Sequence, residues 1–146
     1  MNLLVRPSQP SDDSRIRALL EESHLPTESV GTGVTEFFLA TEGHEIVGVA
    51  GFEFYNDDAL LRSVAIAARL RDRGMGSLLV AWMIGHAKER NMKRIFLLTQ
   101  TAENFFARTG FHVTGRTGTG NPAMESSEQF SSSCPSSAVC MKMELC

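Results

Sequence analysis

A short glycine-bearing turn between an expected strand and an expected helix constrains this chain more than any other feature. The turn has the sequence Arg71-Asp-Arg-Gly-Met-Gly76, after the apolar stretch 59–66 and before the apolar-striped stretch 76–91. Gly74 and Gly76 remove side chains where a ligand would approach the backbone, and the first amides of the following helix lack intrahelical acceptors. Such a turn favours binding of a phosphate. A plain strand-to-helix connection with solvated arginines is the alternative.

The hydrophobic pattern around this turn predicts a mixture of strands and helices. We expect strands at 3–6, 36–41, 45–55, 59–66, 94–98, 111–114 and 138–145, and helices at about 12–23, 76–91 and 102–108. The second to fourth strands form an antiparallel meander by their turn signals. The strand 94–98 follows a helical crossover and should lie parallel to 59–66. The sequence predicts a single α/β domain over residues 1–146, with irregular loops at 24–33 and 115–137.

Composition and cysteine usage narrow the possible partners. The chain has 146 residues, a net charge of -3 and 42% hydrophobic residues, which is typical of a soluble globular domain. The acidic balance disfavours nucleic-acid binding, and no apolar run approaches the ~20 residues of a membrane span. Cys134, Cys140 and Cys146 are odd in number, so we expect a reducing cytoplasm and no disulfide framework. Three late cysteines do not form a metal site.

The order of the elements, together with two motifs, resembles the GNAT superfamily of N-acetyltransferases. Arg71, Gly74 and Gly76 match its Arg/Gln-x-x-Gly-x-Gly/Ala loop, and Phe106 with Gly110-Phe111 matches its aromatic-x-x-x-Gly-Phe ending. The resemblance covers nearly the whole chain. It implies a mixed central sheet flanked by helices, with antiparallel N-terminal strands and a splayed parallel pair formed by the fourth and fifth strands. It also implies acetyl-CoA as cosubstrate and no metal.

The resemblance further implies which residues bind acetyl-CoA. Backbone groups of Val64 and Ile66 would pair with the pantetheine arm, and amides from Arg71 to Ser77 would bind the pyrophosphate. The full implied set is Val64, Ile66, Arg71, Asp72, Arg73, Gly74, Met75, Gly76, Ser77, Thr99, Phe105 and Phe106. Packing of the helix is the alternative role for the two phenylalanines.

Two positions depart from the family pattern. Thr99 stands where many members have Asn, and Phe106 stands where many have a Tyr that acts as general acid. Phe106 has no proton to give. A thiol pKa near ~8.5 makes the thiolate a tolerable leaving group, so transfer is not excluded, and water, Ser63 or Thr99 could donate the proton.

A narrower similarity concerns the acceptor. Several segments look like the arsenic-resistance N-acetyltransferase branch, namely Leu25-Pro-Thr27, Gly51-Phe-Glu-Phe-Tyr55, Ala59-Leu-Leu-Arg-Ser-Val-Ala65, Leu98 to Phe106 and Cys134-Pro-Ser-Ser-Ala138. This similarity implies a small-molecule amine as acceptor and a role in arsenic or toxicant resistance. Cys134 is a candidate for arsenic ligation or for an acyl-cysteine. It has no second cysteine at the spacing of a paired site, so a solvated or packed thiol is favoured.

Glu53 is the first candidate for the general base, because a carboxylate is out of place on an apolar strand face. The alternative is a cross-strand ion pair with Arg62, which follows if Asp57-Asp58 is the two-residue turn. Glu103 is the second candidate, although a carboxylate in a first helical turn commonly interacts with the helix dipole. Ser63 completes the catalytic set. Tyr55 and Arg62 are candidates for binding the acceptor, and a core role is the alternative for Tyr55.

We therefore expect an acetyl-CoA-dependent N-acetyltransferase that works by direct transfer in a ternary complex. The alternative is a degenerate GNAT fold that binds CoA as a sensor without turnover. A homodimer is a further expectation, because an exposed last strand, 138–145, could pair between subunits.

Overall fold

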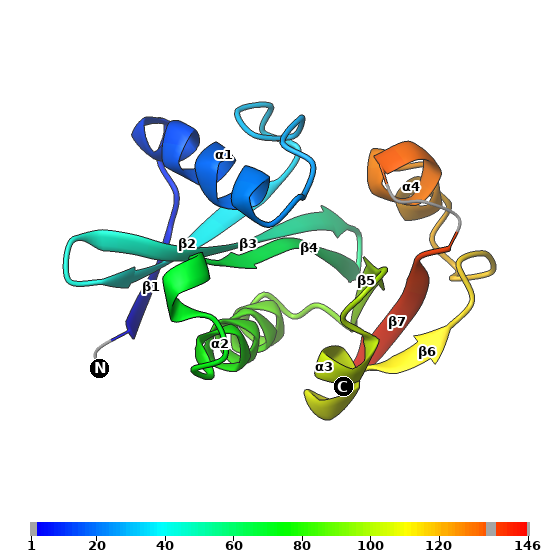
Figure 1. Ribbon diagram of the computed structural model, residues 1–146. Helices are drawn as coiled ribbons and strands as arrows, with labels where there is room; N and C mark the ends of the chain where they lie inside the picture. Colours follow the sequence, from blue (N-terminus) through cyan, green and yellow to red (C-terminus); the bar gives the residue numbers. More distant parts are fainter. Residues whose placement is uncertain (1–2, 134–136, 146) are drawn as a thin grey trace. The chain divides into compact units, whose positions relative to one another are not determined.

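The computed structural model describes residues 3–133 and 137–145. In chain order the elements are β1 (Leu3–Pro7), η1 (Pro10–Asp12), α1 (Asp13–Glu22), β2 (Glu36–Glu42), β3 (Glu45–Tyr55), β4 (Asp58–Ile66), η2 (Ala68–Leu70), α2 (Met75–Glu89), β5 (Arg94–Thr99), α3 (Glu103–Arg108), β6 (His112–Thr114), α4 (Pro122–Glu125), η3 (Gln129–Ser133) and β7 (Val139–Glu144). These bounds agree with the expected strands and helices to within one or two residues (Figure 1).

The seven strands of the described residues form one mixed sheet in the order β1-β2-β3-β4-β5-β7-β6. β1, β2 and β3 pair antiparallel. β4 and β5 pair in parallel, with Asp58–Leu60 alongside Arg94–Phe96. A parallel pair after a helical crossover, within an otherwise antiparallel sheet, confirms the predicted fold class. The splay of this pair stays a prediction.

The last strand differs from its expected position. β7 pairs antiparallel with β5 on one side and with β6 on the other, so Met141 lies between Leu97 and Val113. Its backbone groups are therefore used on both edges, and the expectation of an exposed last strand was wrong. Because strand order is set by contacts between distant segments, the alternation within residues 138–145 could not reveal it.

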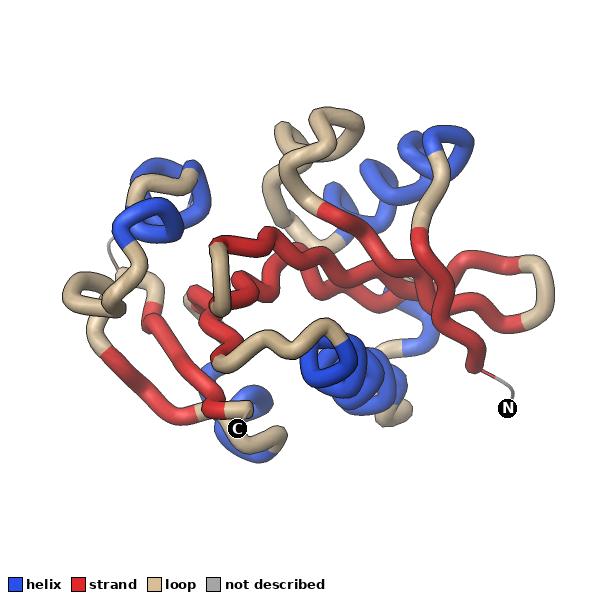
Figure 2. The backbone as a smooth tube through the Cα atoms, turned by 180° about the vertical axis from the view of Figure 1, so that it is seen from behind, coloured by secondary structure: helices blue, strands red, loops and turns tan. Residues whose placement is uncertain are grey.

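Two local expectations also need correction. The two-residue turn after β3 is Asn56-Asp57, and Asp58 already belongs to β4. The expected long loop at 115–137 contains the helical turns α4 and η3 (Figure 2). Asn121 begins α4 as its N-cap, and Pro122 occupies the first helical position, where its missing N–H costs nothing.

The chain divides into two compact units, Met1–Glu53 with Arg62–Met83, and Phe54–Leu61 with Ile84–Cys146. β3, β4 and α2 contribute residues to both units. The expectation of one domain over residues 1–146 stays a prediction.

In the first unit, alternation along β2 decides which helix each side chain meets. The face toward α1 is formed by fully or nearly fully buried apolar residues, namely Ile16, Leu19, Leu20, Val30, Phe37, Leu39, Val49, Ala65 and Ala67. Phe38 lies between Phe37 and Leu39 on β2 and points to the opposite face. There its ring centroid lies 5.3 Å from that of Trp82 on α2 and 6.5 Å from that of Phe52. Each large buried side chain contributes about 1.5–3 kcal/mol, so these two layers fix the strands that precede the glycine turn.

The second unit has its own apolar core beneath α4 and η3. It consists of Leu60, Phe96, Leu98, Met124, Phe130, Ala138 and Cys140, with Tyr55 packed against it. This cluster explains why the segment after β6 folds back: Met124 of α4 and Phe130 of η3 both bury their side chains in it.

Candidate functional site

The glycine turn leads into the N-terminus of α2. Asp72 and Gly74 have left-handed backbone angles, with φ of 65° and 78°, and α2 begins at Met75. The first intrahelical bond runs from the Leu78 N–H to the Gly74 carbonyl at 3.2 Å. The amides of the three residues between them precede this bond and have no intrahelical acceptor, so they face outward at the positive end of the helix dipole. This geometry suits an anion.

The arginines near the turn do not act as one group. Arg71 donates from Nη2 to the Ser23 hydroxyl at 2.9 Å and from Nε to the Ile66 carbonyl at 3.3 Å, which ties the turn to the end of α1. Arg69 forms an ion pair with Glu45 at 2.6 Å. Arg73 is exposed on the turn itself. Of the arginines between 62 and 73, only Arg71 and Arg73 belong to the turn.

β4 leads into this turn and has an unusual backbone angle at its centre. Ser63 has φ of 59°, a left-handed conformation that is uncommon for a residue other than glycine. Val64 and Ile66 follow it and are half-buried, whereas Ala65 between them is buried. A left-handed residue within a strand re-aims the residues around it, and such conformations cluster at functional sites.

Glu53 and Arg62 form a buried ion pair. The Arg62 Nη1 donates to the Glu53 Oε2 at 2.7 Å, and the side chains are 3% and 4% exposed. The same carboxylate oxygen accepts a bond from the Thr35 hydroxyl at 3.1 Å, and the Arg62 Nε donates to the Ser63 hydroxyl oxygen at 3.1 Å. This is the structural alternative for Glu53, and it forms although the turn lies one residue earlier than expected. Thr35 gave no sequence signal, since it precedes its strand by one residue and the contact spans 18 positions.

The remaining candidates lie in the second unit. Phe106 is buried, and its ring meets those of Phe105 at 5.0 Å and Phe111 at 5.8 Å. The Thr99 hydroxyl accepts a bond from the Ala102 N–H at 3.0 Å, which fixes the entry into α3. Glu103 is exposed in the first turn of α3.

The first unit thus brings together Glu53, Arg62, Ser63, Val64, Ile66 and the turn 71–77, and the second contains Tyr55, Thr99, Glu103, Phe105 and Phe106. Tyr55 packs on the second unit's core, in line with the structural role considered for it.

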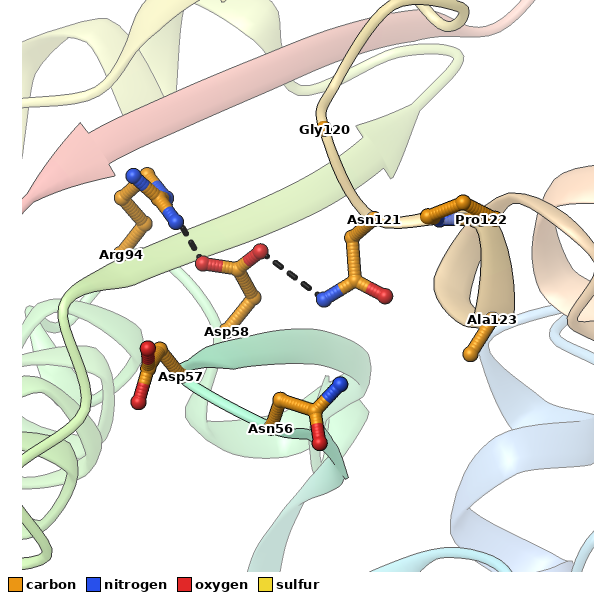
Figure 3. Close-up of a pocket in the computed structure, with 8 residues that line it drawn as sticks. All are labelled: Asn56, Asp57, Asp58, Arg94, Gly120, Asn121, Pro122 and Ala123. Atoms are coloured by element: carbon orange, nitrogen blue, oxygen red, sulfur yellow. Dashed lines mark hydrogen bonds and ion pairs between the residues drawn. The ribbon is translucent and has the colours of Figure 1, made fainter.

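A polar network in the second unit was not anticipated (Figure 3). Asp58 is 2% exposed, and its carboxylate accepts bonds from Arg94 Nε at 2.7 Å and Asn121 Nδ2 at 2.9 Å. The Asn121 amide also donates to the Tyr55 carbonyl at 2.8 Å, and its oxygen accepts from the Met124 N–H at 3.1 Å. The hydrogen bond to Asp58 raises the pKa of the Arg94 guanidinium. An Asn followed by Pro is a common helix start, so Asn121-Pro122 was a signal that could have located α4 within the expected loop 115–137. No signal near residue 121 indicated the bonds to Asp58 and Tyr55.

This network lines a pocket of about 330 Å³ formed by Asn56, Asp57, Asp58, Arg94 and the segment 120–123. The polar groups of Asp58 and Asn121 bond one another and the backbone, so their evident role is to fasten the segment before α4 to the turn after β3.

Among the described residues, potential metal ligands are scattered and the one cysteine is buried. Within 3–133 and 137–145, no three His, Cys, Asp or Glu side chains are grouped so that they could hold a metal ion. Cys140 is a buried free thiol, and burial raises its pKa to about 11. Cys134 and Cys146 lie outside the described residues. Across the described stretches, no helix has the length and apolar character needed to span a membrane.

Comparison with known proteins decides the family. A model of the acetyltransferase (GNAT) family matches residues 4–111, which include β1 to β5, the glycine turn and α3. The chain belongs to the acetyltransferase (GNAT) family. This GNAT assignment confirms the resemblance at the level of the superfamily. The arsenic-resistance branch stays a prediction.

A curated relative agrees with the GNAT assignment. An uncharacterized N-acetyltransferase, CT2212, from Chlorobaculum tepidum is 29% identical over 85 residues, which cover 58% of this chain and 54% of the relative. The chain therefore matches only about half the length of that relative.

The fold is similar to that of N-acetylglutamate synthase from Neisseria gonorrhoeae in complex with coenzyme A and N-acetyl-glutamate, with a TM-score of 0.84 and 19% identity. That match covers 100% of this chain and 36% of the synthase. Rv2747 from Mycobacterium tuberculosis, in complex with CoA, gives a TM-score of 0.80 at 21% identity and covers 98% and 99% of the two chains. At these identities the similarity establishes the fold.

Proposed function

We propose that this GNAT chain transfers the acetyl group of acetyl-CoA to the amine of a small molecule. The observation that supports this most directly is the N-terminus of α2, where outward-facing amides follow a left-handed Gly74. A pyrophosphate accepts hydrogen bonds from such amides and is favoured by the helix dipole. Arg73, exposed on the same turn, adds a charge-assisted bond to the phosphate.

The remaining cosubstrate contacts follow from the family. The pantetheine arm pairs with backbone groups of Val64 and Ile66, on the strand that enters the turn. Thr99, Phe105 and Phe106 remain contacts that the family resemblance implies. Coenzyme A in the N-acetylglutamate synthase and in the Mycobacterium protein supports this choice of cosubstrate.

The acceptor is proposed from sequence similarity to the arsenic-resistance branch, as a small amine or an amino-containing arsenical. The reaction is direct: the amine nitrogen attacks the thioester carbon, and the thiolate of CoA leaves. Tyr55 and Arg62 were expected to bind the acceptor, but Arg62 is bonded to Glu53, so Tyr55 is the better candidate. A cytoplasmic location remains part of the proposal, whereas the homodimer loses the reason given for it, because β7 is paired on both sides.

A second candidate function is a CoA-binding sensor without turnover. The observation that favours it is Phe106, which stands where many family members have an acid and is buried among Phe105 and Phe111. A phenylalanine ring there supplies packing and no proton.

Isothermal titration with acetyl-CoA tests the proposed function first. We expect binding in the micromolar range, and an Arg73→Ala variant that binds about 10-fold more weakly, because a charge-assisted hydrogen bond is lost. Arg108→Ala, an exposed arginine at the end of α3, is the matched control. Absence of binding at sub-millimolar acetyl-CoA, in protein shown to be folded, would sink the proposal.

A turnover assay distinguishes the two candidate functions, an acetyltransferase and a CoA-binding sensor. Wild-type protein is incubated with acetyl-CoA and single amines, among them glutamate and an amino-containing arsenical, and free CoA is quantified by chromatography. Chromatography is preferred to thiol reagents, because the chain has three cysteines. Acceptor-dependent release of CoA supports the enzyme, and binding without release supports the sensor.

A further inference from the structure

A proton donor must be found elsewhere if Phe106 cannot supply one. We propose that the Ser63 hydroxyl relays the proton from the attacking amine to the departing CoA sulfur, and that Arg62, held by Glu53, is its positioning residue. This inference rests on the proposed function. It concerns residues of the first unit that the structure joins by hydrogen bonds.

The first observation is the backbone of Ser63. Its φ of 59° costs an ordinary residue roughly 1–2 kcal/mol, whereas glycine adopts this angle without penalty. A serine at this backbone angle therefore makes the fold less stable than a glycine would. The hydroxyl is what the serine adds, and the left-handed backbone sets the direction in which it points.

The second observation is the chain of bonds behind that hydroxyl. The Arg62 Nε donates to the Ser63 Oγ at 3.1 Å, and the Arg62 Nη1 is held at 2.7 Å by the Glu53 carboxylate. Thr35 donates to that same carboxylate oxygen at 3.1 Å. Because Arg62 is 5% exposed, solvent barely competes for its guanidinium. The Ser63 oxygen is an acceptor in this arrangement, so its hydrogen is directed away from Arg62.

The third observation is the position of Ser63 along β4. In the proposed function the pyrophosphate lies at residues 71–77, and the pantetheine arm runs back along the strand past Ile66 and Val64. Ser63 is the next residue in that direction, at about 3.3 Å of rise per residue. The reactive sulfur is at the far end of the arm, so an arm bound along this strand places the sulfur near the Ser63 hydroxyl.

The relay balances in atoms and electrons. The amine nitrogen forms a bond to the thioester carbon, and the carbon–sulfur bond breaks with its electron pair left on sulfur. The Ser63 hydroxyl gives its hydrogen to the sulfur and takes the surplus proton of the nitrogen in return, directly or through one water. The adjacent guanidinium stabilises negative charge that builds on the oxygen during the exchange. Ser63 ends unchanged, and the products are the N-acetyl amine and CoA with a free thiol.

The decisive variant is Ser63→Gly, because glycine fits the left-handed backbone and removes only the side chain. We expect its single-turnover rate of acetyl transfer to fall about 100-fold, the lower range for loss of a general acid–base group. Its dissociation constant for acetyl-CoA should stay within 3-fold of wild type, and its melting temperature should not fall. Ser126→Ala, an exposed serine after α4, is the control and should match wild type.

Two further measurements distinguish a relay from a structural role. Added imidazole should restore part of the rate to Ser63→Gly and none to Ser126→Ala, since a small acid can replace the missing hydroxyl. Arg62→Lys keeps the charge but loses the Nε geometry, and it should lower the turnover number about 10-fold with KM little changed.

A Ser63→Gly rate within 3-fold of wild type overturns the relay, even where wild type is active. If Ser63→Gly fails to fold, Ser63→Ala decides by the same measurement, because alanine keeps the backbone cost of serine and removes the hydroxyl: a single-turnover rate within 3-fold of wild type overturns the proposal, and a larger fall supports it. Failure of wild type to transfer acetyl to any amine, despite binding acetyl-CoA, is a different result, which points to the sensor.

Discussion

The Arg62 guanidinium and the Glu53 carboxylate meet at 2.7 Å on adjacent strands, with both side chains almost fully removed from solvent. Burying two charges is costly unless each keeps its partner, so this pair is structural as well as functional in our proposal. It also changes the role of Glu53. The carboxylate that was the first candidate for a general base has its Oε2 bonded to Arg62 and Thr35.

Removal of one partner should therefore be severe. Glu53→Ala leaves a buried guanidinium without its counter-ion, and we expect the free energy of unfolding to fall by about 3–5 kcal/mol, measured by urea denaturation. The double variant Glu53→Leu with Arg62→Met should recover much of that loss. Glu103→Ala, which removes an exposed carboxylate, should stay within about 0.5 kcal/mol of wild type. A loss below 1 kcal/mol for Glu53→Ala would contradict the role of the pair.

Gly74 and Gly118 offer a matched comparison of the proposed cosubstrate site. Both have left-handed backbones, with φ of 78° and 72°, and an added Cβ would meet nothing within 4 Å at either position. Alanine should therefore destabilise each by a similar amount, about 1–2 kcal/mol. Only Gly74→Ala should weaken acetyl-CoA binding, by 10-fold or more in titration calorimetry, because its Cβ stands where a phosphate would approach. Equal affinities in the two variants would argue against a phosphate on this turn.

Asn121 should be important for stability out of proportion to its size. Alanine at this position removes the N-cap of α4 and leaves the buried Asp58 carboxylate and Tyr55 carbonyl short of a donor. We expect Asn121→Ala to cost about 2–4 kcal/mol in urea unfolding. Asn121→Asp keeps the cap acceptor but places a second carboxylate beside Asp58, so it should be no better. Asn104→Ala, at an exposed position of α3, is the control, and similar losses in both would refute this assignment.

Acid sensitivity should depend in part on Asp12. Its carboxylate accepts bonds from Arg6 at 2.9 and 3.1 Å and from the Gln9 N–H at 2.8 Å, and the Arg6 bond is the main reason that the pKa of Asp12 lies below its usual range. A lowered pKa in the folded state contributes stability that is complete above the unfolded value, about 3.9, and is lost as pH falls through the folded value. The Arg6 side chain is 43% exposed, so screening limits the effect to roughly 1 kcal/mol.

Urea unfolding between pH 2.5 and 7 measures this contribution. Asp12→Asn should reduce stability at pH 7 and flatten the acid side of the profile, so that the two proteins converge at low pH. Glu21→Gln, at an exposed carboxylate near the end of α1, should follow the wild-type profile. An unchanged acid limb in Asp12→Asn would show that the pair contributes nothing measurable.

The sequence predicted most of what depends on neighbouring residues. Apolar side chains at 16, 19 and 20 repeat at the helical period and are fully buried on α1. The glycines at 74 and 76 marked the passage from strand to helix, and α2 begins between them. The parallel placement of β5 beside β4 followed from the helical crossover that joins them. These features need only local periodicity, turn chemistry and the handedness of crossovers.

Other features were beyond sequence reasoning because they pair residues far apart in the chain. Nothing near residue 141 indicates that β7 enters the sheet between β5 and β6. The bond between Asn121 and Asp58 spans 63 positions, and its formation depends on where the helical turn α4 packs.

By itself, then, the chain determined its family, its sheet-and-helix order and the turn at residues 71–76, through signals contained within a few residues. Only the tertiary structure decided what its charged groups do. Glu53 could have been a base or an ion-pair partner, and the choice depended on whether Arg62 on the next strand lay within hydrogen-bond reach of it. A buried charge takes its chemistry from the groups packed around it, and those are set by the fold.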